Sequence, residues 1–244
     1  MKTVKKTITA ALVLFMITLT QSCVINGVNA ISGDGNVESR SYEIDKFNVL
    51  KLGGSFNVII TEGKQEQLVI KTDENLYQYL NVESGNNVLS IYSDRDIVLR
   101  PTKLEIHLTY TALEQVLVSG ACKLKSETTI RSDSFMLNIS GAGAGELDVE
   151  AEKLRTKVSG AASLILTGTA TTHEASLSGA SSLKANDLIT ENTVIKLSGA
   201  GSATVHATET LDANLSGVGS IKYSGDPKTK QTDVSGIGRI SSDE

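Results

Sequence analysis

The chain has 244 residues, of which 40% are hydrophobic and 21% are charged, and its formal net charge is −5. This length provides one large or two small domains with a sizeable core. An acidic chain without a basic stripe is a poor candidate for binding nucleic acid or anionic headgroups. We therefore expect no nucleic-acid partner.

Residues 1–22 are predicted to be a lipoprotein signal peptide. Three lysines precede an apolar run over residues 8–19, which is too short to span a bilayer as a mature helix. Ser22 directly before Cys23 is typical of a bacterial lipoprotein processing site, although Thr20 stands where such sites usually have Leu. The alternative is an ordinary signal peptide with a cysteine there by chance.

Lipid on Cys23 would place the protein in the cell envelope as an outer membrane lipoprotein, on the periplasmic side or at the cell surface. Without the three signal lysines, 20 basic residues stand against 28 acidic residues, a net charge of −8. Membrane attachment is therefore expected to come from the lipid. Cys122 would remain as a small packing residue, and no disulfide is expected.

Residues 23–39 are rich in Gly, Asn and Ser and are predicted to be a flexible tether. Residues 40–112 are predicted to be an N-terminal β portion that caps one end of the following segment. One helix is expected over residues 73–80, with Asp73 as its N-cap and Tyr77 and Leu80 toward the core. The strands of this portion are expected over residues 47–52, 55–61, 67–72, 88–92 and 103–109.

Residues 113–244 contain a repeat of about nineteen residues. Each copy has Ser, then Gly, then Ala, Val or Ile, and an aliphatic residue directly before the Ser. Polar and apolar residues alternate before the Ser, as in a half-buried strand. The copies begin at Ser119, Ser140, Ser159, Ser178, Ser198, Ser216 and Ser235.

Two architectures could hold this unit. A meander of hairpins favours Asn-Gly or Asp-Gly turns, which the repeats lack, whereas a coil stacks each copy on the next at about 4.8 Å. We therefore predict an all-β fold, a right-handed parallel β-helix (solenoid) of about seven coils with an N-terminal β cap. The Ser hydroxyls would form a structural ladder, and Pro227 with the polar end would blunt the last edge.

Three stretches resemble one known family. They are residues 56–63, residues 87–91 and the repeat series that ends in Gly217-Val218-Gly219-Ser220-Ile221-Lys222-Tyr223-Ser224-Gly225-Asp226-Pro227. Over roughly residues 36–242 the chain is similar to the putative auto-transporter adhesin head GIN domain family. The resemblance implies an exported β-helical protein of Gram-negative bacteria, often a lipoprotein, and it implies no catalytic residues.

The motifs of catalysis are missing from the sequence. No Gly-x-Ser-x-Gly elbow occurs, the Gly-rich run 141–145 lacks the dinucleotide-loop spacing, and no calcium nonapeptide is present. The three His lie far apart in sequence, so we expect no metal site. No cofactor is expected either.

Three classes of function remain. The first is a non-catalytic adhesin-like or structural binding module, the second is a periplasmic scaffold that binds a protein partner, and the third is a polysaccharide-active, pectate-lyase-like enzyme. The chain has no Trp, and its acids are scattered in sequence, which disfavours the enzyme. The partner would be an unknown envelope protein or glycan, and partner-binding candidates are the loop 94–101 and three aromatic residues, Tyr77, Tyr79 and Tyr92.

Overall fold

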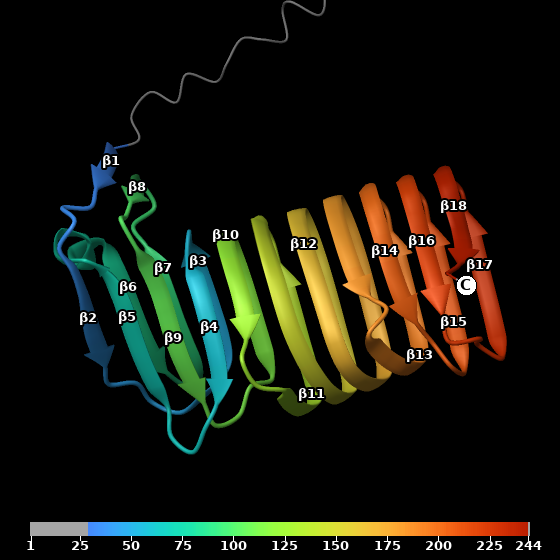
Figure 1. Ribbon diagram of the computed structural model, residues 1–244, viewed down its shortest axis with the longest axis horizontal. Coiled ribbons are helices and arrows are strands. Elements are labelled where there is room, and N and C mark those ends of the chain that lie inside the picture. Colours follow the sequence, from blue (N-terminus) through green and yellow to red (C-terminus); the bar gives the residue numbers. More distant parts are fainter. Residues whose placement is uncertain (1–28, 244) are drawn as a thin grey trace, which may run out of the picture.

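The computed structural model describes residues 29–243, which form eighteen strands and one short 3-10 helix (Figure 1). The first part of the chain contains β1 (Asn29–Ser32), β2 (Val37–Tyr42), β3 (Phe47–Gly54), β4 (Asn57–Glu62), β5 (Gln67–Asp73), η2 (Glu74–Tyr79), β6 (Leu80–Gly85), β7 (Asn87–Ser93), β8 (Ile97–Arg100) and β9 (Leu104–Tyr110). The second part contains β10 (Gln115–Ser126), β11 (Ile130–Ile139), β12 (Ala142–Ala185), β13 (Leu188–Leu197), β14 (Ala200–His206), β15 (Thr210–Leu215), β16 (Val218–Ser224), β17 (Thr229–Val234) and β18 (Ile237–Ser242).

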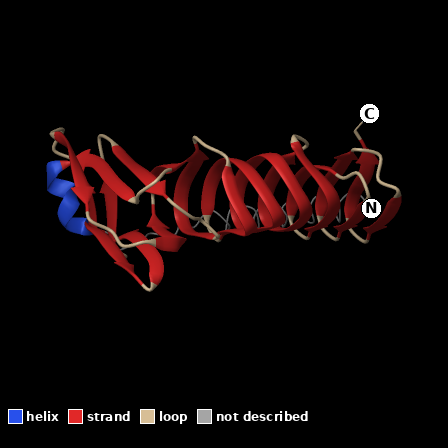
Figure 2. Cartoon of the chain, turned by 90° about the horizontal axis from the view of Figure 1, so that it is seen from below, coloured by secondary structure: helices blue, strands red, loops and turns tan. Residues whose placement is uncertain are grey.

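The fold is all-β, but the prediction of a right-handed parallel β-helix of about seven coils with an N-terminal β cap was wrong. Sixteen strands form one large mixed sheet, whose main path runs β17-β15-β13-β12-β11-β10-β4-β9-β5-β2. The repeat strands pair in parallel, whereas β2, β5 and β6 pair antiparallel with their neighbours in the same sheet. Figure 2 shows the strand layers following one another along the molecule, with η2 at one end.

One of the antiparallel pairs, β6 with β7, comes from a turn that is neither Asn-Gly nor Asp-Gly. Strands β6 and β7 form a hairpin in which Gly85 faces Val88. Between them Asn86 and Asn87 have φ angles of 51° and 62°. Two consecutive residues with positive φ are the mark of a type I′ hairpin turn, and Asn tolerates that conformation well. A search limited to Asn-Gly and Asp-Gly therefore missed this hairpin.

Successive repeats lie on one another in parallel register. The aliphatic residues before the serines are direct Cα partners, as in the series Leu52, Val118, Ile139 and Val158. All four side chains are buried. The alternation read from the sequence therefore assigns the inward face of these strands correctly.

The repeat glycines are required because backbone packs against backbone. A Cβ built on Gly179 would lie 2.3 Å from the carbonyl oxygen of Gly160, and one on Gly160 would lie 2.1 Å from that of Gly141. Gly179 also has a φ of 88°, where a side chain is strained. The same column continues through Gly199, Gly217 and Gly236.

This column begins one layer earlier than the sequence period indicated. Gly120 packs on Gly54, and Ser119 pairs with Gly53. Because Gly53 stands where the later layers have Ser, the layer of β3 and β4 did not match the repeat pattern. The boundary predicted between residues 40–112 and 113–244 thus falls inside one continuous sheet.

The Ser ladder is structural. The hydroxyl of Ser140 donates to the carbonyl of Val118 at 3.3 Å, and the hydroxyl of Ser178 donates to the carbonyl of Val158 at 3.2 Å. Each of these serines therefore joins its own layer to the preceding one through the backbone. Ser119 and Ser198 make the equivalent bonds to Leu52 and Leu177.

The segment predicted as a tether, residues 23–39, is partly folded. Within it, β1 pairs with β8, and β2 begins at Val37 and pairs with β5. Cys23 and the signal segment 1–22 lie outside the described residues. The expected helix over residues 73–80 is present as the 3-10 helix η2, and Asp73 makes no capping bond with its side chain.

Candidate functional site

The candidate site is a hollow of about 740 Å³ at the end of the molecule where β1 and β8 lie (Figure 1). Strand β7 and the loop after it form one side, β8 forms the rim, and the first glycine corners form the floor. The lining residues are Gly53, Gly54, Ser55, Phe56, Tyr92, Ser93, Asp94, Arg95, Ile97, Val98, Leu99, Ser119, Gly120 and Ala121.

Tyr92 is the aromatic residue that is held most directly at this hollow. It lies on β7 beside Ile91, which is buried in the core, so the alternation of the strand directs Tyr92 outward. Its hydroxyl donates a hydrogen bond to Glu83 on β6. This bond to a carboxylate raises the pKa of the Tyr92 phenol and fixes the position of the ring.

The loop after β7 is fastened at its first residue. The backbone N–H of Asp94 donates to the carbonyl of Tyr79 at 3.1 Å, and its carboxylate accepts a bond from Asn81 at 2.8 Å. The loop then turns back, with the N–H of Ile97 directed at the carbonyl of Asp94. Arg95 is left exposed at the mouth of the hollow.

The rim strand β8 is held from one side only. It pairs in parallel with β1, and among the described residues it has no other strand partner. Three consecutive β8 residues line the hollow, and the Val98 side chain is 47% exposed. The rim is therefore apolar, while the walls carry hydroxyl, carboxylate and guanidinium groups.

The other two predicted tyrosines lie outside the hollow. Tyr77 is buried, and its hydroxyl donates to the carbonyls of Ile70 and Glu38 at 2.7 and 3.0 Å. The guanidinium of Arg40 lies 4.0 Å from its ring centroid, and burial raises the pKa of this phenol. Tyr79 is half-buried on η2. Of the three residues, Tyr92 alone lines the hollow.

Asp73 organises the chain around this end, a role that sequence reasoning missed. Its buried carboxylate accepts bonds from the N–H groups of Gly35 at 2.9 Å and Thr102 at 2.7 Å. Burial disfavours the charged form, but these hydrogen bonds outweigh it and lower the pKa of Asp73. Only the tertiary structure brings residues 35, 73 and 102 together.

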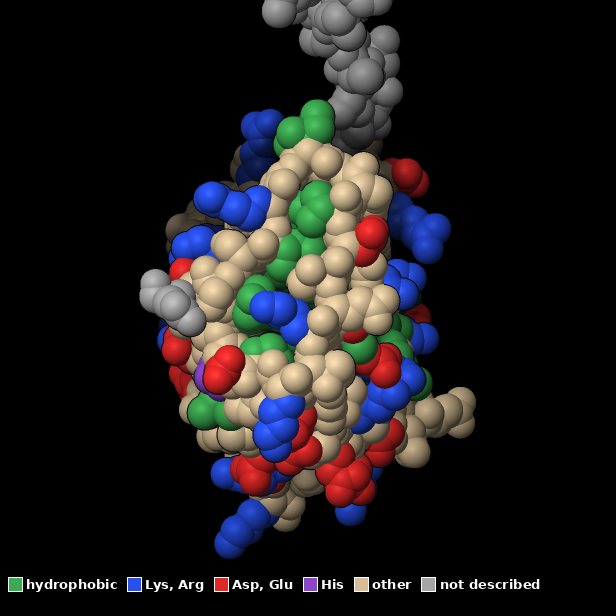
Figure 3. Space-filling model, turned by 90° about the vertical axis from the view of Figure 1, so that its right-hand side faces the viewer, with side chains coloured by type: hydrophobic (Ala, Val, Ile, Leu, Met, Phe, Trp, Pro, Cys, Tyr) green, Lys and Arg blue, Asp and Glu red, His purple; other side chains and the backbone are tan. Residues whose placement is uncertain are grey.

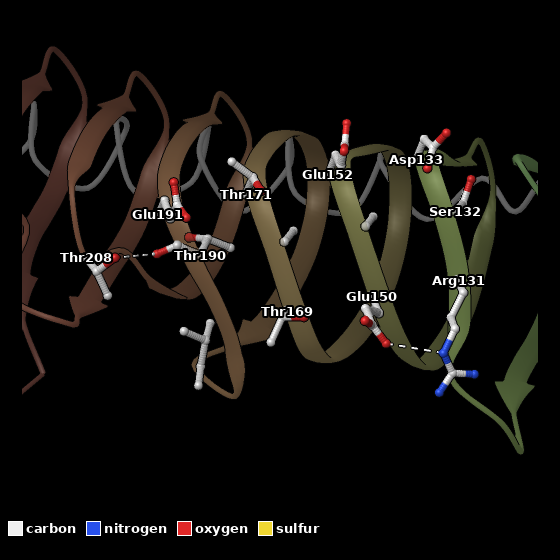
Figure 4. A pocket seen from close by; sticks show the side chains of 13 residues that line it. Arg131, Ser132, Asp133, Glu150, Glu152, Thr169, Thr171, Thr190, Glu191 and Thr208 are labelled. Atoms are coloured by element: carbon white, nitrogen blue, oxygen red, sulfur yellow. Dashed lines mark hydrogen bonds and ion pairs between the residues drawn. The ribbon is translucent and has the colours of Figure 1, made fainter.

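A second concave surface runs across the repeats. It is an open groove of about 550 Å³ over β11, β12 and β13, and Figure 4 shows its side chains standing along successive layers. Arg131 is paired with Glu150 at 3.2 Å and with Glu62 at 3.1 Å. The structure gathers acids that are scattered in sequence onto this face, namely Asp133, Glu150, Glu152 and Glu191.

The lining of this groove contains no aromatic residue, so no ring is available there to stack on a sugar. Among residues 29–243, no group of three or more His, Cys, Asp or Glu is arranged to hold a metal ion. His173 is buried in the core with its Nε2 3.2 Å from the Thr156 hydroxyl. Burial lowers the pKa of His173 to about 4. His173 is therefore a neutral core residue at pH 7.

The described part of the chain contains no helix long and apolar enough to cross a membrane.

Cys122 is a buried free cysteine whose pKa is raised by burial, and it packs at the corner beside Gly54. This agrees with its predicted role as a packing residue.

The sequence of residues 46–227 matches the family described as "Putative auto-transporter adhesin, head GIN domain". The chain belongs to this family. The GIN match covers β4 and β9, most of the repeats and the hollow described above. It confirms the resemblance seen in the sequence, and the family description indicates an envelope-associated, adhesin-like binding module.

Solved structures of proteins from Bacteroides and Parabacteroides share the fold of this chain. A putative adhesin from Bacteroides fragilis NCTC 9343 is 26% identical, with a TM-score of 0.84 over 87% of this chain and 99% of that chain. A putative lipid binding protein from Parabacteroides distasonis ATCC 8503 is 25% identical, with a TM-score of 0.75 over 88% and 100%. A putative adhesin from Parabacteroides merdae ATCC 43184, 21% identical with a TM-score of 0.64, covers 88% and 100%. No curated protein matches the chain.

Proposed function

We propose that the protein is a non-catalytic, adhesin-like lipoprotein of the outer membrane that binds its partner in the hollow beside Tyr92. The observation that carries this proposal is the lining of the hollow: the Tyr92 ring held by its hydrogen bond, the buried Phe56 beside it, an apolar rim, and charged and hydroxyl groups within about 740 Å³. Recognition sites are typically concave and mostly apolar, with a few placed polar groups. The repeats supply a stiff support for this site.

The mixed lining fits an envelope glycan or a protein loop. Tyr92 offers a ring face, Arg95 and Asp94 offer both charges, and Ser55 and Ser93 offer hydroxyls. Such groups can bond the hydroxyls of a sugar or the backbone of a peptide. The acidic groove over the repeats, which lacks a ring, is not assigned a substrate.

The position of the hollow favours a partner in the same envelope, which is the scaffold alternative. It lies beside β1, where the described chain begins, and only residues 23–28 separate β1 from the proposed lipid. Six residues span at most about 21 Å. A lipidated molecule would therefore hold this end close to its own membrane.

The experiment is a binding screen of the purified full chain against envelope glycans and envelope proteins. Tyr92→Ala and Val98→Asp should each weaken the binding of any hit by about tenfold, because each removes part of the hollow. Ile189→Ser, on the groove over the repeats, is the control and should leave binding unchanged. A hit that is lost with Ile189→Ser but kept with Tyr92→Ala would move the site to the groove.

Two further measurements test the remaining parts of the proposal. Cys23→Ala should abolish lipid labelling and move the protein from the membrane to the soluble fraction, and an unchanged, unlabelled membrane fraction would remove the anchor. Incubation with envelope polysaccharides should give no cleavage. Cleavage that disappears with Glu150→Gln would establish an enzyme in place of a binding module.

A lipid ligand is a second candidate, because one structural relative is described as a putative lipid binding protein and the rim of the hollow is apolar. The screen therefore includes lipid vesicles with the Cys23→Ala chain, which lacks its own lipid. Vesicle binding that is lost with Val98→Asp would favour this candidate over a glycan.

A further inference from the structure

The end of the sheet formed by β17 and β18 has no cover among the described residues. At the opposite end, β2 and β6 pair antiparallel onto the last strands, and η2 follows β5. Figure 3 looks onto the β17 and β18 end and shows a stripe of hydrophobic side chains, with a Lys or Arg side chain at its middle and further charged groups around it. Uncovered strand edges of this kind pair readily with another chain.

The backbone of β18 is ready to pair on its open side. Ile237 and Asp243 direct their N–H groups to the carbonyls of Gly217 and Tyr223 in the preceding layer. Because backbone groups alternate in direction along a strand, residues 238, 240 and 242 direct theirs to the open edge. In the described chain, β18 pairs with β16 alone.

Exposed apolar side chains lie on three strands at this end. Ile237 on β18 is 77% exposed, its partner Val218 on β16 is 55% exposed, and Val234, the last residue of β17, is 44% exposed. On β17, Lys230 is the Cα partner of buried Leu211 and therefore occupies an inward position. Its ammonium group donates to the Tyr223 hydroxyl at 2.8 Å. A lysine in an inward column protects β17 from pairing, so β18 is the available edge.

The charges of this end are balanced, so that the acidic groups of one copy can pair with the basic groups of another. Residues 226–243 carry three acidic and three basic groups, whereas the whole chain has a net charge of −5. An antiparallel pair of two β18 strands centred on Ser241 places Arg239 of each copy opposite Asp243 of the other. In this register residue 240 of one copy faces residue 242 of the other. Both residues direct their N–H and C=O groups to the open edge, so they form hydrogen-bonded pairs.

We propose that this edge is an interface for a second copy of the chain, formed by antiparallel pairing of β18 with β18 about a two-fold axis. The pairing satisfies the open backbone groups of residues 240 and 242 and makes two reciprocal Arg239–Asp243 pairs, in which each Asp243 also keeps its 2.7 Å bridge to Lys222 of its own copy. It leaves the two β1 ends at opposite ends of the dimer. The interface does not depend on the Tyr92 hollow.

The test is the oligomeric state of the full chain carrying Cys23→Ala, measured by sedimentation and light scattering up to about 100 µM. A dimer is expected. Arg239→Asp and Asp243→Arg should each lower the association constant by about tenfold, because each creates two like-charge contacts. The double variant, with both Arg239→Asp and Asp243→Arg, should restore the association constant, and Lys157→Asp should leave it unchanged.

Three outcomes would overturn the proposal. They are a monomer at every concentration, a dimer that ignores both single charge changes, and a dimer that both single changes weaken but the double variant does not recover. Arg239 and Asp243 are exposed, but Asp243 also bridges Lys222 of its own copy at 2.7 Å, so thermal unfolding of each variant is measured to show that the fold is kept. Loss of ligand binding with Tyr92→Ala, without loss of the dimer, would separate this interface from the proposed recognition site.

Discussion

The two parts of the sheet are stabilised by different kinds of contact. In the repeats, from β10 onward, each buried residue packs on the equivalent residue of the next layer, so one period in the sequence specifies many contacts. In the part from β2 to β9, the contacts depend on single features, such as the turn at Asn86 and the carboxylate of Asp73. The structure of the repeats can therefore be predicted from one repeated pattern. The part from β2 to β9 cannot, because its contacts occur only once.

The distribution of aromatic residues follows the same division. Five of the six tyrosines precede the repeats, and the sixth, Tyr223, lies near the far end. Near-ultraviolet circular dichroism of tyrosine thus reports mainly on the part from β2 to β9, while the far-ultraviolet signal is dominated by the longer repeat part. The two signals allow the two parts to be followed separately.

Leu177→Asp should have the largest effect. Leu177 is buried between Val158 and Leu197, and a carboxylate placed there costs on the order of 5 kcal/mol, comparable with the stability of a whole domain. The far-ultraviolet signal should be lost at much lower denaturant than in the parent. Exposed Lys157→Asp is the matched control and should change stability by less than about 0.5 kcal/mol. Equal losses for both would contradict the register.

Acid should weaken the repeats through His173. Its pKa is about 4 in the folded chain and about 6.5 when unfolded, so unfolding takes up a proton between these values. Neutral His173 contributes about 3 kcal/mol to the free energy of unfolding above pH 6.5, and this contribution falls as the pH drops toward 4. His173→Gln should remove this part of the pH dependence of unfolding. Parallel pH profiles for the parent and the variant would show that His173 is not buried.

Gly179→Ala compared with Gly35→Ala measures the close approach of backbones in the repeats. Both glycines have positive φ, at 88° and 86°, but a Cβ on Gly35 meets nothing within 4 Å. Each change should cost about 1 kcal/mol for the conformation, and Gly179→Ala about 2 kcal/mol more for its clash with Gly160. Denaturant unfolding measures the difference. Equal losses would mean that the layers can move apart without cost.

Part of the candidate site could be predicted from the sequence. Tyr92 and the loop that begins at Asp94 were selected because they break the repeat pattern, and the structure places them around one hollow. Tyr77 met the same criterion but is buried, as its predicted core-facing position on the helix indicates, so breaking the repeat pattern does not by itself mark an exposed binding residue. The floor of the hollow, at Gly54 and Ala121, comes from two layers that are joined only in the folded sheet.

The sequence by itself determined the all-β class, the parallel stacking of repeats, the inward residues and the family, because period and alternation translate directly into contacts between neighbouring layers. Only the tertiary structure decided that β2 and β5 join the same sheet as antiparallel strands, since these pairings and the buried carboxylate of Asp73 act through partners distant in sequence. It also decided which edge remains open. That depends on the direction of backbone groups in β18, which no residue pattern encodes.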